Sequence, residues 1–216
     1  MVVEHETLAP PRWQATSKAV PDFLIAADFL IVWINPYFLR NIAGWLPGPG
    51  IVGAMVFLLF FEFFMVGFYG PVALLAHSKK PTGVKIAGLG FMGLLCLPFV
   101  VMSCKAVKGV WPLLEVVLLG WNKWLGGKRS SDHELGTFHI IFRWATMGGL
   151  MVAVLFSMIV IPVPKFGTES WMVRESGISM SGEFANKPHQ FLAAGVIYFT
   201  CLGIYEIIFH RVTTKS

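Results

Sequence analysis

The chain has 216 residues, of which 56% are hydrophobic and only 13% are charged, and its formal net charge is +5. A soluble domain of this length rarely carries so few charges, so the composition argues against a water-soluble globular protein and indicates a bundle of membrane helices. Basic residues flank apolar runs, as at Lys79 and Lys80, where anionic lipid headgroups attract them. No clustered basic motif indicates nucleic-acid binding.

The cysteines and the first 20 residues add two further exclusions. Cys96, Cys104 and Cys201 lie in or at the end of apolar runs, and no CxxC pair is present. This pattern indicates small buried side chains, not a disulfide framework or a thiol-redox enzyme. Residues 1–20 lack the basic start and apolar core of a signal peptide, so we interpret them as a polar N-terminal tail.

Apolar runs of membrane-spanning length make residues 21–210 a single bundle, followed by a short tail at 211–216. A spanning helix needs about 20 mostly apolar residues. The sequence predicts five such helices, at 22–39, 51–76, 84–104, 137–163 and 189–209. The first is interrupted by Asp22, Asp28, Asn35 and Pro36. The predicted fold is therefore an all-α polytopic membrane helix bundle.

The segment 107–125 has a different pattern. Its apolar side chains recur at three- and four-residue steps with charged residues between them, which is typical of an amphipathic helix. Trp111, Trp121 and Trp124 belong to the apolar stripe, and tryptophan favours the membrane interface. We predict an interfacial helix anchored by these tryptophans. The alternative, a sixth span, would have a short apolar part.

The longest polar connection runs over 165–188 and mixes charged with aromatic residues. Because loops often carry interactions, we predict that this one contacts a partner protein. Basic residues divide almost evenly between the two sides of a five-span bundle. The positive-inside rule therefore gives no orientation.

Glu62 is the most unusual residue, because it lies near the middle of the apolar run 51–76. A carboxyl group exposed to hydrocarbon is costly. We therefore predict that Glu62 faces other helices, within hydrogen-bonding reach of a polar group. That group would be Asp28 or Asn35 on the first span, or one on the fourth or fifth span. A structural hydrogen bond and a functional carboxyl both fit this pattern.

A second polar group is predicted where the fourth and fifth spans meet. His139 and Arg143 are four residues apart near the start of one, and Glu206 and His210 are four apart near the end of the other. Residues at this spacing share a helix face. If the two helices are antiparallel neighbours, the four side chains form one layer, with Glu62 deeper in the bundle.

Several chemistries fit this layer. His139 and His210 could ligate a b-type haem, and histidines with carboxylates could bind a transition metal. Glutamate, histidine and arginine could also relay protons or bind a quinone. In the structural alternative, the same groups contact lipid headgroups and pair with one another. No motif such as HExxH identifies a metal site, so the cofactor stays open, and bound phospholipid is expected.

The leading hypothesis from the sequence is a non-catalytic integral membrane subunit that binds lipid and partner helices within a larger complex. It follows from the small size of the chain and the lack of a catalytic motif. The alternative is a redox or proton-handling membrane subunit that uses His139, Glu206, His210 and Glu62. A small-solute transporter ranks third, because the sequence lacks inverted repeats and paired broken helices.

Overall fold

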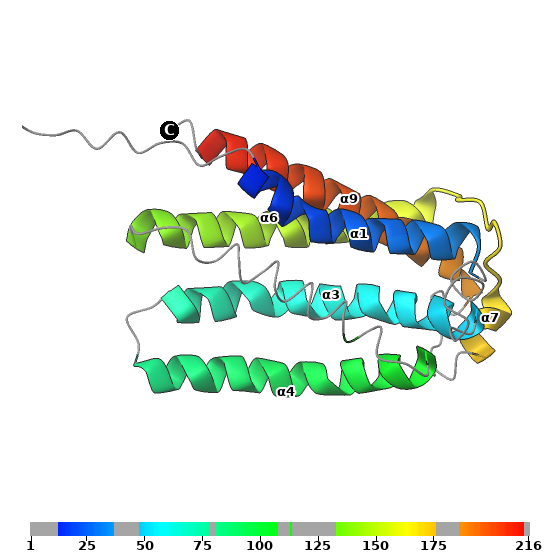
Figure 1. Cartoon of the computed structure of the whole chain (residues 1–216), viewed down its shortest axis with the longest axis horizontal. Helices are drawn as coiled ribbons and strands as arrows, with labels where there is room; N and C mark the ends of the chain where they lie inside the picture. Colours follow the sequence, from blue (N-terminus) through cyan, green and yellow to red (C-terminus); the bar gives the residue numbers. More distant parts are fainter. Residues whose placement is uncertain are drawn as a thin grey trace, which may run out of the picture.

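The computed structural model describes residues 13–36, 48–77, 81–107, 113, 133–175 and 186–213. Within these ranges the secondary structure is helical. The helices are α1 (Trp13–Ile34), α3 (Gly48–His77), α4 (Thr82–Val107), α6 (His133–Val160), the short α7 (Ser170–Glu175) and α9 (Pro188–Thr213). The long helices lie roughly along one axis, with α4 at one edge of the bundle and α1 with α9 at the other (Figure 1).

In the described part of the chain, four helices contain a segment long and apolar enough to cross a membrane. The segments are Gly50–Leu75 in α3, Thr82–Met102 in α4, Ile140–Val160 in α6 and Pro188–Ile208 in α9. They coincide with four of the five predicted spans. The remaining predicted span, 22–39, corresponds to α1, which is also a helix but does not belong to this group, since Lys18, Asp22 and Asp28 interrupt its apolar sequence.

Some helix boundaries differ from the predictions. Residues 1–20 were predicted as a polar tail, but α1 begins at Trp13, and Ala19 is fully buried. Tertiary packing therefore extends the helix into the tail. The fourth span was predicted to reach 163, but α6 ends at Val160, because Pro162 disfavours helical geometry at the residue before it.

Two predicted segments lie partly or largely outside the described residues. The interfacial helix at 107–125, with Trp111, Trp121 and Trp124, stays a prediction. Of the loop predicted at 165–188, the described part includes α7. Two hydrogen bonds join the start of this loop and the residue before it to the end of α1. The Trp33 indole donates to the Pro164 carbonyl at 2.9 Å. The Thr168 hydroxyl donates to the Trp33 carbonyl at 3.2 Å.

The most extensive contact in the bundle is between α1 and α9. Phe29 of α1 lies against Gly195 of α9, and Phe23 lies against Gly203, so the two helices are antiparallel. A β-carbon at either glycine would overlap the facing phenylalanine ring. These two glycines therefore let the aromatic rings of α1 rest on the backbone of α9.

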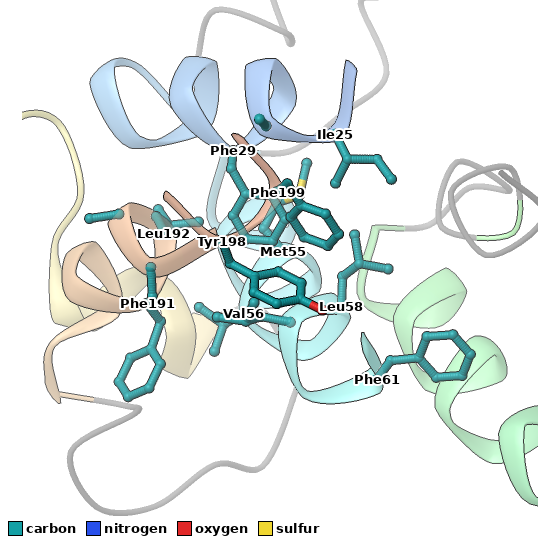
Figure 2. Packing of buried hydrophobic residues seen from close by; sticks show 14 of the residues in the cluster. Ile25, Phe29, Met55, Val56, Leu58, Phe61, Phe191, Leu192, Tyr198 and Phe199 are labelled. Atoms are coloured by element: carbon teal, nitrogen blue, oxygen red, sulfur yellow. The ribbon is translucent and has the colours of Figure 1, made fainter. Parts of the chain in front are cut away.

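The core lies among α1, α3, α6 and α9. Its fully buried side chains include Ile25, Phe29, Met55, Leu58, Leu192, Tyr198 and Phe199 (Figure 2), together with Met147, Met151 and Leu202. In contrast, α4 has α3 as its principal neighbour, and Ile86, Phe91 and Leu94 are 60–65% exposed. Lipid tails or another protein would have to cover an apolar surface of this kind.

Candidate functional site

Glu62 is fully buried, and its Oε1 atom accepts a hydrogen bond of 3.1 Å from the hydroxyl of Tyr198. Tyr198 is itself fully buried, and its hydroxyl points from α9 toward α3 (Figure 2). Glu62 lies at the midpoint of the membrane-length segment of α3. The carboxyl group therefore faces other helices, as its cost in hydrocarbon predicts, and its hydrogen-bond donor comes from the fifth predicted span.

Arg143 of α6 and Glu206 of α9 form a buried ion pair, with 8% of each side chain exposed. The start of α6 therefore lies beside the end of α9, as an antiparallel arrangement requires. Tyr69 of α3 completes this contact, since the guanidinium carbon of Arg143 lies 5.8 Å from the centre of its ring. This is a cation–π distance. Three helices thus meet at the guanidinium group.

Asp22 of α1 is a third buried carboxyl group, with no exposed surface. It interacts electrostatically with both Arg143 and Tyr198. The neighbouring Phe23 contacts Gly203, which places Asp22 within about one turn of Glu206 along the antiparallel α1–α9 pair. Asp22 therefore lies along the bundle axis between the levels of Tyr198 and Glu206.

In the sequence, Asp22 is only an interruption of an apolar run, and Asp28 was a predicted partner of Glu62 on this helix. A periodicity signal could have identified Asp22. It precedes the buried residues Ile25, Ala26 and Phe29 at spacings of three, four and seven, which is the spacing of one helix face. Asp28 lies off this stripe and is half-buried.

The cluster has two levels along the bundle axis. Glu62 and Tyr69 are seven residues apart on α3, and Tyr198 and Glu206 are eight apart on α9. At a rise of about 1.5 Å per residue, the Glu62–Tyr198 level and the Arg143–Glu206 level are about 10–12 Å apart. The Arg143–Glu206 level lies near the end of the membrane-length segments of α6 and α9. The cluster therefore extends from one end of the bundle to its middle.

The histidines of the predicted layer are on helices α6 and α9, but the side chains of His139 and His210 lie outside the described part of the structure. Their assignment to a haem or a metal stays a prediction. Among the described residues, no group of three or more histidine, cysteine, aspartate or glutamate side chains could hold a metal ion. The structure brings together Arg143 with Glu206, as predicted for this layer. It also pairs Glu62 with Tyr198, a residue that was not among the predicted site residues.

No protein family model, curated protein sequence or solved structure matches this chain. Its function is therefore inferred from the residues of the buried polar cluster.

Proposed function

We propose that this chain is a multi-pass integral membrane protein that takes up and releases protons at Glu62. The observation that supports this proposal is the hydrogen bond between Tyr198 and Glu62. It joins two fully buried side chains at the midpoint of an apolar helix segment of 26 residues. Ionisable groups at such a depth are rare because of their cost, and they commonly belong to proton or ion pathways.

The extent of the cluster favours proton handling over a purely structural role. A structural hydrogen bond requires one donor and one acceptor, and the Tyr198–Glu62 pair already supplies both. Asp22, Arg143 and Glu206 continue the buried polar groups toward one end of the bundle. Carboxyl and hydroxyl groups in such a series are the groups that relay protons through membrane proteins.

A subunit role in a larger membrane complex is a second candidate, and α4 is the observation that favours it. Its principal neighbour is α3, and its apolar side chains are exposed. A cysteine in place of Leu94 should form cross-links to another protein in native membranes if a partner covers α4. Cross-links to lipid alone would contradict this role.

Infrared difference spectroscopy of the purified full-length protein tests proton handling directly. A protonated carboxyl group has a C=O stretching band that disappears on ionisation. We expect a carboxyl band that changes when the protein takes up or releases protons and that is lost in Glu62→Gln. The matched control is Asp28→Asn, which removes a half-buried carboxyl of α1 outside the buried stripe; it should lose only the signal of Asp28 and retain the Glu62 band. A pH-dependent carboxyl spectrum identical in wild type and Glu62→Gln would overturn the proposal.

A further inference from the structure

The buried polar groups are distributed unevenly along the bundle. From Glu62 toward the end at which α6 begins, the described buried residues include Asp22, Arg143 and Glu206. In the opposite direction, the next buried polar residues that the structure describes are Thr168 and His189, at the far end. Among the described residues, the buried ionisable side chains therefore lie from the middle of the bundle to one end, apart from His189 at the far end.

The apolar half is closely packed. Buried side chains from three helices fill it, among them Met55, Leu58, Leu59, Val154, Met158 and Leu192, of which Met55, Leu58 and Leu192 are seen in Figure 2. On α3 every residue from 50 to 61 is apolar, which amounts to about 18 Å of helix. Among the described buried residues of this layer, none has an ionisable side chain that could carry a proton, and a charge in such surroundings is strongly disfavoured.

Asp22 occupies the position between the two polar levels. Phe23 contacts Gly203 and Phe29 contacts Gly195, so the antiparallel register sets Asp22 along the axis between Tyr198 and Glu206, and its side chain is fully buried. It also belongs to α1, whereas the other members of the cluster belong to α3, α6 and α9. Among the described side chains, the titratable groups that act on Arg143 and Tyr198 also include Glu62 and Tyr69 from α3 and Tyr205 and Glu206 from α9.

We infer that Glu62 exchanges protons with one side of the membrane only, the side on which α6 begins and α9 ends, and that Asp22 is the carboxyl that relays them. This inference rests on the proposed function. Asp22 takes a proton from the aqueous side and passes it toward Tyr198. The Tyr198 hydroxyl gives its own proton to the Glu62 carboxylate and is reprotonated from Asp22. In total, one proton enters from the aqueous side and one proton is added to Glu62, and at each transfer one O–H bond forms as another breaks. Proton release follows the same steps in reverse order.

The relay role of Asp22 is tested by the rate at which the Glu62 band responds to a rapid change of pH. In Asp22→Asn we expect the equilibrium band of Glu62 to remain and its response to slow by about tenfold or more. Asp28→Asn, on the same helix, should respond at the wild-type rate. Asp22→Glu keeps a carboxyl and should retain most of the rate, which separates proton relay from a packing role. An unchanged rate in a folded Asp22→Asn protein would overturn the relay.

Sidedness is tested in sealed liposomes by changing the pH outside only. In a chain whose Cys96, Cys104 and Cys201 are replaced by serine, Ser216→Cys marks the end at which α9 terminates. An impermeant maleimide then measures the fraction of molecules with this end outward. We expect the fraction of Glu62 that responds rapidly to equal the labelled fraction. A rapid response from every molecule, or from the unlabelled fraction, would overturn one-sided access.

These outcomes are distinguishable from failure of the proposed function. If wild-type protein shows no pH-dependent band from Glu62, then proton handling itself is wrong. If the band is present but its rate is independent of Asp22 and of membrane side, only the inference about relay and sidedness is wrong.

Discussion

Tyr198 of α9 donates a hydrogen bond to Glu62 of α3 at a point where both side chains are fully buried. The pair has a structural and a chemical consequence. It satisfies a carboxyl group inside an apolar segment, and it places a second exchangeable proton beside that carboxyl. Substitutions at the two positions can separate these consequences.

The first prediction concerns the stability contributed by this pair. Glu62→Gln should have little effect on unfolding, because the amide oxygen still accepts from Tyr198. Glu62→Leu leaves the buried Tyr198 hydroxyl without this acceptor and should destabilise the protein by about 1–3 kcal/mol. Denaturant unfolding in detergent, followed by circular dichroism, measures the difference.

A double substitution provides the control. Replacing both partners of a buried hydrogen bond by apolar groups is far less costly than removing one. Glu62→Leu combined with Tyr198→Phe should therefore be more stable than Glu62→Leu alone. If the double variant loses the sum of the two single effects, the two side chains do not act as a pair.

The second prediction concerns the ion pair at the outer level. Arg143→Met leaves Glu206 as a buried carboxyl without its guanidinium partner, and it should cost about 3–5 kcal/mol in unfolding free energy. Lys105→Met, at the exposed end of α4, is the matched removal of a positive charge. It should change stability by no more than about 0.5 kcal/mol. Equal effects of the two substitutions would contradict the buried pairing of Arg143.

The third prediction concerns the contact between α1 and α9. Gly195→Ala should destabilise the bundle by about 1–3 kcal/mol, because the added β-carbon overlaps the ring of Phe29. Gly90→Ala in α4 is the control, since its β-carbon would meet no atom within 4 Å. Alanine favours helix over glycine, so Gly90→Ala should be neutral or stabilising. Thermal unfolding of both variants measures these effects. A Gly195→Ala protein as stable as the wild type would contradict the close approach of the Phe29 ring to the backbone of α9.

The fourth prediction separates proton handling from haem chemistry at His139 and His210. A bis-histidine haem gives a strong Soret band in the absorption spectrum. We expect the purified protein to lack this band while it shows the pH-dependent carboxyl signal of Glu62. A Soret band that disappears in His139→Ala and in His210→Ala would instead support a b-type haem site.

The sequence alone determined the class of structure. Apolar runs of spanning length predicted α3, α4, α6 and α9, because hydrophobicity summed over about 20 residues is a local property of each segment. It also determined that Glu62 needs to face protein, because the cost of a carboxyl group in hydrocarbon does not depend on which neighbour it meets.

Only the tertiary structure decided which polar groups meet. Tyr198 is separated from Glu62 by 136 residues, and their contact depends on the rotation and register of α3 against α9. The role of Asp22 likewise depends on α1, whose apolar run is the most interrupted and whose buried face is defined by its packing on α9. Hydrophobicity specifies that helices associate, but the close fit of side chains such as Phe29 on Gly195 selects the angle and register at which they do so.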